Sequence, residues 1–366
     1  MKTMLDYINE EQAALTQILN QFQLTDTDVS KVTHCLILAT GSSHNACQAA
    51  KVYLEEVAPI YVEIQEPFNF AHYGKVDDRF DLVVAVSQSG KSASTIDAIA
   101  KIKNQTSVKT VALTSDVTSP ITEVVDEVLD LKMGLETVGF VTKGYTTTLL
   151  NLFLFGLKLG YQKHQLTKVE VEEELAKLAK AIQEIDSVIY KTEQFWQKTK
   201  KELTEGTRFI AIGYGPNIGT AKEFETKFTE TVRLPSQGFE VEAYMHGPYL
   251  EADTTHLLFF IENQSPIQAR SQALRNYLAS YVGQCYTITT RSTRASNTLE
   301  LASDVEEKIS PLLLVIPFQY LAYQVATSKG IDLSQRIFDD FDCVLKSKIA
   351  KKEGNQPYPN LSLIHI

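Results

Sequence analysis

Short apolar runs alternate with segments of helical spacing along most of the chain. In the first half, the apolar runs are HCLILA at 34–39, DLVVAV at 81–86 and KTVALT at 109–114. Continuous apolar runs of this length are typical of strands that are buried on both faces. The first two runs are followed by glycine-containing turns and then by helical segments at 46–57 and 93–103. This alternation predicts a parallel sheet with helices on both faces.

The second half of the chain repeats this organisation. It contains RFIAI at 208–212, the turn GYGP, a helical segment at 220–233, and two further apolar runs at 256–261 and 285–289 that flank a helical segment at 269–282. Repetition of one supersecondary pattern indicates a duplicated unit. The predicted fold class is therefore α/β, with two doubly wound three-layer α/β/α modules that each contain a parallel sheet.

Two helical segments lie outside these modules. Apolar residues recur at helical spacing over 4–22, which predicts an amphipathic N-terminal helix. The segment 167–203 is rich in Glu, Lys, Ala and Leu and has no Gly or Pro, which predicts a long helix that joins the modules. We therefore expect five parts: an N-terminal helix within 1–30, a first module over 31–165, a linker helix over 166–204, a second module over 205–335 and a C-terminal tail over 336–366.

The composition is that of an ordinary globular protein, with 44% hydrophobic and 22% charged residues among 366. The 45 acidic and 35 basic residues give a net charge of -10, which disfavours binding to nucleic acid or to an anionic membrane. The four cysteines form no CxxC pair, so we expect neither a metal site nor a disulfide framework, and a reducing cytoplasm as the location. We also expect no secretory signal and no membrane span.

A polar loop with the sequence SQSGKS lies at 87–92, between an expected strand and an expected helix. At such a place the free backbone N–H groups and the helix dipole favour an anion. The uncharged side chains suit a phosphate monoester, and the GxxxxGK[ST] loop of nucleotide triphosphate sites is absent from the sequence. We expect the phosphate of a small metabolite to be bound by Ser87, Gln88, Ser89, Gly90 and Ser92. The alternative is a polar turn in which a serine caps the helix.

Two other loops are candidates for the rest of this pocket. Gly41, Ser42 and Ser43 follow the first strand, at the corresponding place in the sheet. A simple helix cap is the alternative function of these serines. Glu136 begins the loop ETVGFVT, which leads into KGYTTT at 143–148, a segment with more hydroxyls and glycines than ordinary core segments have.

A carboxylate and a histidine in the second half are candidates for acid and base chemistry. The segment KEFETKFTE predicts an amphipathic helix on which Lys227 and Glu230 are neighbours. His246 lies in YMHGP, where a Gly-Pro turn would hold its imidazole. Such a pair can divide proton transfer on a sugar, although for either residue taken singly a solvated helix face or a turn is the more common role. The loop ENQSP at 262–266 has an acid and a proline, so we expect phosphate in the first module only.

Taken together, these motifs resemble those of the double sugar isomerase (SIS) domain family. This family includes the isomerase half of glucosamine-fructose-6-phosphate aminotransferase and the fructoselysine-6-phosphate and glucoselysine-6-phosphate deglycases. The resemblance covers nearly the whole chain. It is carried by GSSHNA, SQSGKSAST, ETVGFVTKGYTTTL, KEFETKFTE, EAYMHGP and PFQYLAYQVATSKGID.

The resemblance implies a flavodoxin-like topology, a homodimer, and a reaction that needs no metal or other cofactor. By residue, it implies that Glu230 is the base that moves a proton between C1 and C2 and that Lys227 lies close to it. His246 would assist ring opening and enter from the neighbouring subunit. The positions that match the family's phosphate-binding residues are Ser43, Ser87, Gln88, Ser89 and Ser92.

The sequence also departs from the family's aminotransferases. Those enzymes carry an N-terminal glutaminase domain with a cysteine nucleophile, whereas this chain has no cysteine before Cys35, so we expect that it does not take ammonia from glutamine. Ungapped counting from Gly330 places Phe341 where the family has an imine-forming lysine. An insertion of about five residues in the tail would place Lys346 there instead. The family's serine near Val141 is also absent.

These departures favour a deglycase of a 6-phosphorylated sugar-amine adduct, of the fructoselysine or glucoselysine type. A second hypothesis is an aldose-ketose phosphosugar isomerase or an aminosugar-6-phosphate isomerase or deaminase. A third hypothesis, from a different class, is a sensor that binds a phosphosugar without turnover. The presence of Glu230 and His246 and the lack of a basic DNA-binding region in the sequence disfavour the sensor.

Overall fold

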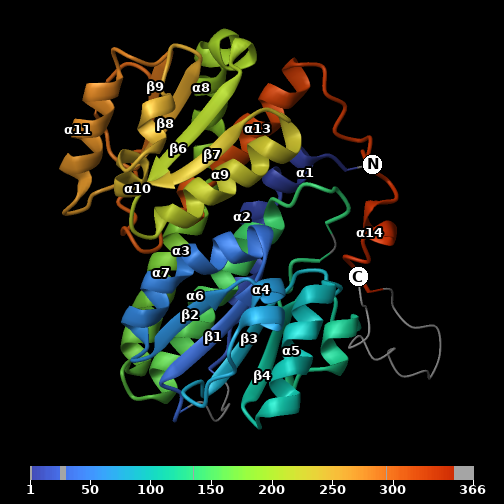
Figure 1. Cartoon of the computed structure of the whole chain (residues 1–366). Coiled ribbons are helices and arrows are strands. Elements are labelled where there is room, and N and C mark those ends of the chain that lie inside the picture. The colour runs from blue at the N-terminus through green and yellow to red at the C-terminus, as the bar shows by residue number, and fades with distance from the viewer. Residues whose placement is uncertain (1, 25–29, 135, 294, 350–366) are drawn as a thin grey trace.

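Two α/β modules make up the computed structural model, which describes residues 2–24, 30–134, 136–293 and 295–349 (Figure 1). Each module contains a parallel sheet of five strands, in the orders β2-β1-β3-β4-β5 and β10-β9-β8-β6-β7. The strands of the first sheet are β1 (His34–Ala39), β2 (Tyr61–Gln65), β3 (Leu82–Val86), β4 (Lys109–Thr114) and β5 (Glu127–Asp130). Those of the second are β6 (Arg208–Gly213), β7 (Ser236–Glu240), β8 (His256–Glu262), β9 (Gln284–Thr289) and β10 (Thr298–Glu300).

The two sheets have the same topology. When the strands of the second module are numbered in their own chain order, both sheets have the order 2-1-3-4-5. This is the doubly wound order of flavodoxin-like folds, in which ligands bind at the carboxyl ends of the strands. The predicted fold class and the predicted duplication are thereby confirmed.

Alternate residues of the central strands face the two helical layers, as the pleat of a strand requires. On β1, Cys35, Ile37 and Ala39 join the core beneath α3 (Gly41–Val57) and α6 (Lys143–Gln162). Leu36 and Leu38 join a second core together with residues of α4 (Pro67–Tyr73) and α5 (Ala93–Gln105). Both faces of the sheet are therefore buried.

The modules meet through two helices that follow the first strand of each sheet. Helix α3 of the first module packs against α9 (Asn217–Thr231) of the second. A Cβ atom at Gly219 would lie 2.5 Å from the Asn45 carbonyl oxygen and 2.6 Å from the Ala49 amide nitrogen. Gly219 therefore lets the two helix backbones approach closely, which brings the side chains of α9 to the first module.

The remaining helices surround these layers. They are α1 (Met4–Asn9), α2 (Glu11–Asn20), η1 (Pro120–Glu123), α7 (Lys168–Gln183), α8 (Ile185–Glu205), α10 (Val241–Met245), η2 (Pro248–Glu251), α11 (Gln268–Leu278), α12 (Pro311–Leu314), α13 (Ile316–Ser328) and α14 (Phe341–Val344). No helix in the part of the chain that the structure describes is both long enough and apolar enough to cross a membrane.

Three sequence-based expectations about helices need correction. The linker expected over 166–204 is two helices, because the amide of Glu184 bonds to the Ala181 carbonyl three residues back and the helical ladder restarts there. The N-terminal segment is likewise divided at Glu10 into α1 and α2. The glycine turn expected before 46–57 is instead the first turn of α3, which begins at Gly41.

Candidate active site

The loop 87–92 joins β3 to α5 at the carboxyl edge of the first sheet. Gly90 has a φ of +62°, and a Cβ atom there would collide with the side chain of Ser119. The Gln88 carbonyl accepts hydrogen bonds from Ser115 Oγ at 2.7 Å and Thr114 Oγ1 at 3.1 Å. The loop backbone is therefore held in one conformation by β4 and by the turn that follows it.

Three hydroxyl groups gather at the start of α5. Ser92 is the N-cap residue, and its Oγ lies 3.0 Å from Thr95 Oγ1 and 3.2 Å from Ser94 Oγ. Ser89 is exposed, whereas Ser87 is buried at the end of β3. A helix N-terminus with convergent hydroxyl donors is a suitable place for a phosphate group.

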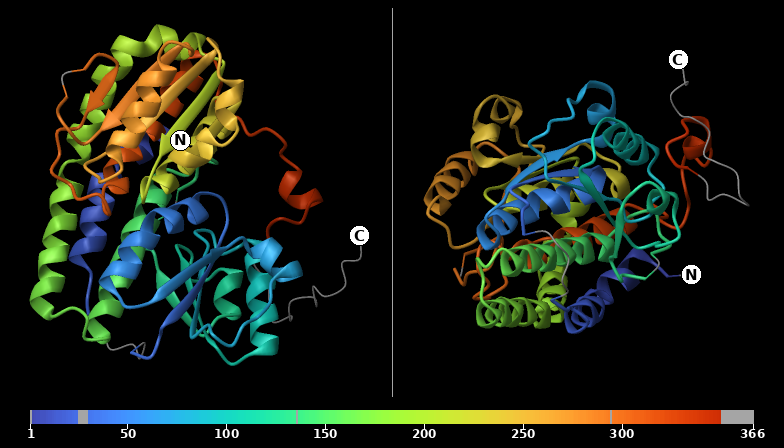
Figure 2. Two further views of the ribbon diagram at one scale, coloured as in Figure 1. Left: turned by 60° about the vertical axis from the view of Figure 1, so that its left-hand side comes forward. Right: turned by 90° about the horizontal axis from the view of Figure 1, so that it is seen from below.

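The C-terminal tail crosses from the second module to this loop (Figure 2). The Ser347 carbonyl accepts a hydrogen bond from the Ala93 amide at 3.1 Å, and the Ile349 amide donates to the Lys91 carbonyl at 2.8 Å. Asp342 accepts from Ser347 Oγ at 2.7 Å. Lys346 directly precedes the paired residues, and it is exposed with a φ of +50°. The tail thus brings Lys346 to the neighbourhood of the loop 87–92, which we call the anion loop after the phosphate that the sequence predicts there.

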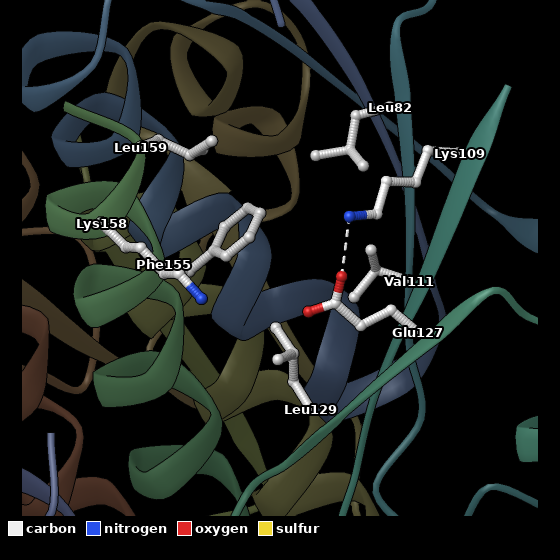
Figure 3. Close-up of a pocket in the computed structure, with 8 residues that line it drawn as sticks. All are labelled: Leu82, Lys109, Val111, Glu127, Leu129, Phe155, Lys158 and Leu159. Atoms are coloured by element: carbon white, nitrogen blue, oxygen red, sulfur yellow. Dashed lines mark ion pairs between the residues drawn. The ribbon is translucent and has the colours of Figure 1, made fainter. Parts of the chain in front are cut away.

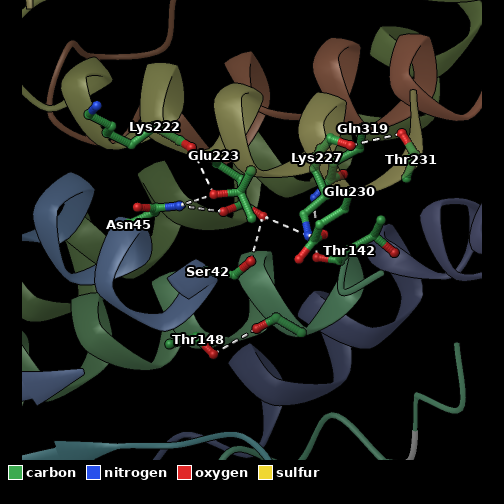
Figure 4. A network of polar contacts seen from close by, with 12 residues as sticks. Ser42, Asn45, Thr142, Thr148, Lys222, Glu223, Lys227, Glu230, Thr231 and Gln319 are labelled. Atoms are coloured by element: carbon green, nitrogen blue, oxygen red, sulfur yellow. Dashed lines mark hydrogen bonds and ion pairs between the residues drawn. The ribbon is translucent and has the colours of Figure 1, made fainter. Parts of the chain in front are cut away.

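Helix α9 carries a buried lysine between two carboxylates (Figure 4). Lys227 Nζ lies 2.6 Å from Glu230 Oε2 and 3.5 Å from Glu223 Oε1. The Lys227 side chain is 1% exposed, whereas that of Glu230 is 38% exposed. Burial alone would lower the pKa of Lys227, but the Glu230 and Glu223 carboxylates raise it above its ordinary value. Lys227 is therefore a fixed positive charge beside a carboxylate that solvent or substrate can reach.

Glu223 connects this group to the first module. Ser42 Oγ donates to Glu223 Oε1 at 3.0 Å, and Asn45 Nδ2 donates to Glu223 Oε2 at 2.9 Å. Burial raises the pKa of Glu223 to about 7, although Lys227 opposes this shift. Sequence reasoning missed Glu223 and Asn45. The spacing of Glu223 four residues before Lys227, one turn away on the same helix face, was the available signal.

Glu136 holds the start of α6 against the anion loop. Its carboxylate accepts three hydrogen bonds at 2.9 Å, from the Thr142 amide, from Thr142 Oγ1 and from the Gly144 amide. A Cβ atom at Gly144 would lie 2.7 Å from Gln88 Oε1, and Gln88 Nε2 donates to Thr148 Oγ1 at 3.3 Å. Glu136 also contributes to the electrostatic field at Lys227. Close contacts therefore connect the start of α6 with the loop 87–92, and the charge of Glu136 acts on Lys227 of α9.

The hydroxyl-rich segment after this loop has a structural role. Thr146, Thr147 and Thr148 are buried in the first turns of α6. Their hydroxyls donate to the carbonyls of Lys143 or Gly144, with the shortest bond, from Thr148, at 2.6 Å. Threonine can satisfy its hydroxyl in this way inside a helix, so these residues need no ligand to be buried.

Not all of the expected residues lie together within one chain. His246 follows α10, its side chain is 80% exposed, and its nearest acidic neighbour is Glu242 at 4.0 Å. No contact among the described residues joins His246 to Glu230. Ser43 is buried in the first turn of α3, and Gly41 is exposed with a φ of +58°.

A small cavity lies at the opposite end of the first sheet (Figure 3). It is lined by the first residues of β3, β4 and β5 and by α6, and the ion pair between Lys109 and Glu127 (2.7 Å) borders it. Its volume is about 10 Å³, which is room for about one water molecule. This cavity is too small for a sugar phosphate and lies at the amino ends of the strands, away from the anion loop.

Known proteins are similar to this chain in architecture and in sequence. The model of the SIS domain family matches residues 28–157 and 202–329. A glutamine–fructose-6-phosphate aminotransferase of Caldanaerobacter subterraneus subsp. tengcongensis is 25% identical over 325 residues, which are 87% of this chain and 53% of that protein. The chain thus spans about half the length of the curated relatives it matches.

Two solved structures are similar over nearly their whole length. A protein of Clostridium difficile 630 that has been assigned as a phosphosugar isomerase superposes with a TM-score of 0.86 and 25% identity, over 95% of this chain and 99% of the other. The C-terminal domain of glucosamine-fructose-6-phosphate aminotransferase from Francisella tularensis superposes with a TM-score of 0.85 and 22% identity, over 91% of this chain and 97% of that domain. Since the family model matches more than half of the chain, the protein belongs to the SIS domain family and contains two copies of that domain.

Proposed function

We propose that the protein is a deglycase that cleaves a 6-phosphorylated sugar-amine adduct. The phosphate would bind at the loop 87–92, and the Glu230 carboxylate would move a proton between C1 and C2 of the sugar. For a 1-amino-2-ketose, transfer from C1 to C2 converts the C1–N amine into a C1=N imine. Water then hydrolyses the imine to an aldose phosphate and the free amine. Atoms balance with one water consumed.

The observation that carries this proposal is the contact of Glu230 with the buried Lys227 at 2.6 Å. The Lys227 ammonium group places a positive charge directly beside the carboxylate that would accept the proton. The same charge would stabilise the negative charge that develops on the sugar oxygen during enolisation. The partial exposure of Glu230 leaves its carboxylate accessible to a substrate.

The variant Glu230→Gln tests this assignment. Glutamine keeps the shape of the side chain but cannot take up a proton, so turnover should fall by about 10²- to 10⁴-fold while phosphosugar binding changes little. Release of lysine from fructoselysine 6-phosphate and glucoselysine 6-phosphate would be measured. Glu172→Gln on α7 is the matched control, because that side chain is 62% exposed and distant in sequence from the α9 carboxylates. Normal turnover by Glu230→Gln would exclude Glu230 as the base.

The same proton transfer would also serve an aldose-ketose isomerase or an aminosugar-phosphate deaminase. The names of the relatives, an isomerising aminotransferase and a phosphosugar isomerase, favour this second candidate. Incubation with each sugar phosphate separates the hypotheses by product, which is lysine for a deglycase, ammonia for a deaminase and an isomeric sugar for an isomerase. Release of ammonia or the isomer without lysine would contradict the deglycase. Tight binding without any product would identify a sensor.

A further inference from the structure

The second module contains a cavity that plays no part in the proposed reaction. It lies at the amino ends of β6, β7 and β8, where Arg208, Ser236 and His256 are the first residues of these strands. Its volume is about 520 Å³, within the range of small-molecule sites. The anion loop, in contrast, lies at the carboxyl edge of the first sheet.

Two arginines give this cavity a positive charge. Arg208 and Arg233 both line it, and neither side chain forms an ion pair with a residue that the structure describes. By comparison, Arg79 and Arg270 lie 3.1 Å and 2.6 Å from carboxylate oxygens. A guanidinium group presents a planar set of donors that matches phosphate and carboxylate oxygens. One acidic side chain, Glu251, also lines the cavity, so the two guanidinium groups outweigh it.

A buried histidine adds a fixed polar group. His256 is 1% exposed, and it pairs in register with Arg208 on the neighbouring strand. Its Nδ1 lies 3.0 Å from Asp253 Oδ1 and 3.2 Å from the Asp253 amide nitrogen. Among the described residues, Asp253 is the one that engages the ring through hydrogen bonds, and it does so at Nδ1.

The cavity also touches the helix that carries the candidate base. Thr229 and Arg233 line it from the end of α9, on either side of Glu230 in the sequence. The amide of Arg233 donates to the Phe228 carbonyl at 3.1 Å, and Arg233 itself has a φ of +58°. Its backbone therefore forms part of the C-terminal end of α9. A ligand in this cavity would therefore contact the last turn of the helix that presents Glu230.

We propose that this cavity is a second anion-binding site, which takes a small molecule with a phosphate group. Arg208 and Arg233 would bind the phosphate oxygens, and His256 would donate or accept one further hydrogen bond through Nε2. The Thr229 hydroxyl and the Gln237 amide line the same cavity and suit the hydroxyl groups of a phosphorylated metabolite. The site is distinct from the loop 87–92 and is independent of which reaction the protein catalyses. It departs from the sequence-based expectation of phosphate in the first module only, which concerned the loop 262–266 at the other end of the second sheet.

A soak of crystals of the full chain with millimolar tungstate, a heavy phosphate analogue, locates each anion by its anomalous signal. We expect one peak between Arg208 and Arg233 in the wild type. The peak should vanish in the double variant Arg208→Ala, Arg233→Ala. It should persist in Lys75→Ala, Arg79→Ala, which removes the same charge from exposed positions of the first module. Absence of the wild-type peak, or a second copy of the chain filling the cavity, would overturn the proposal.

Titration with inorganic phosphate supplies a second readout in solution. Ser87→Ala, Ser89→Ala serves as the background, because it removes two of the hydroxyls that we propose to bind phosphate at the loop 87–92. Adding Arg208→Ala and Arg233→Ala to this background should weaken the remaining phosphate affinity by about tenfold or more. Circular dichroism checks that each variant is folded, which we expect because both arginines are exposed. An unchanged affinity in the folded variant would also overturn the proposal.

Discussion

Gly90 determines the shape of the anion loop. Its φ of +62° is a conformation that costs a residue with a Cβ atom about 1–3 kcal/mol, and the Ser119 side chain occupies the place of that atom. Gly90→Ala should therefore raise the KM for a sugar phosphate by about ten- to a hundredfold through displacement of the loop. Gly330→Ala, just after α13, is the control, since Gly330 has a similar φ of +76° but its Cβ would meet no atom within 4 Å. Equal KM values in the two variants would argue against phosphate binding at this loop.

Glu223 should make stability depend on pH. Its pKa rises from 4.5 in the unfolded chain to about 7 in the fold because it is buried. The folded state therefore holds this proton more tightly, and the associated stabilisation is complete below about pH 4.5 and is lost as the pH rises through about 7. Glu223→Gln removes the titration. The unfolding free energy of the wild type relative to this variant should thus fall between pH 5 and pH 8, by on the order of a few kcal/mol.

Urea denaturation at both pH values measures this difference. Shifted groups that do not contact Glu223 are present in both proteins, so their contributions largely cancel in the comparison. The difference in unfolding free energy between the wild type and Glu223→Gln could instead be the same at pH 5 and pH 8. Glu223 would then be ionised at both pH values, and the effect of Lys227 on its pKa would exceed the effect of burial.

At the scale of elements, the contact of α3 with α9 aligns the candidate site. Gly219→Ala would place a methyl group against the backbone of Asn45 and Ala49, which cannot yield without separating the helices. We expect a loss of about 1–3 kcal/mol in unfolding free energy, with reduced turnover because Asn45 and Ser42 hold Glu223. Gly156→Ala on α6 is the contrast, because its Cβ would first meet the end of the Leu54 side chain at 2.9 Å. A smaller loss for Gly219→Ala than for Gly156→Ala would contradict this reasoning.

The central strands of the two sheets could be predicted from the sequence, whereas the edge strands could not. All six central strands were predicted as apolar runs, and β1 and β4 were predicted to the residue. The four missed strands, β2, β5, β7 and β10, are the edges of the two sheets. An edge strand is partly exposed, as the sequence YVEIQ of β2 illustrates, so it lacks the continuous apolar run that identifies a central strand.

For the whole molecule, we propose that His246 completes the site of a second subunit. Its exposed side chain, with the 75% exposed Leu250 nearby in η2, is consistent with a surface that another chain covers. Glu230→Gln and His246→Ala should each have strongly reduced turnover alone. If the two residues of one site come from different chains, random mixing should restore about a quarter of the sites, because half of the dimers are mixed and one of their two sites is intact.

Activity of the mixture after denaturation and refolding together measures this exchange, with each variant refolded alone as the control. No recovery in a mixture that is dimeric by light scattering would place both residues in one chain. The homodimer, the cytoplasmic location and the division into five parts stay predictions.

The sequence by itself determined the duplicated α/β fold and the central strands. It also placed the loop 87–92 between a strand and a helix, and it placed Lys227 and Glu230 on one helix. The reason is that apolar runs and helical spacing are local patterns, which can be recognised in consecutive residues. The tertiary structure decided what lies between the modules. Glu223 meets Ser42 across 181 positions, and the C-terminal tail pairs with the anion loop. Such contacts depend on the packing of α3 against α9 and on the path of the tail, and no periodicity along the chain encodes which distant residues become neighbours.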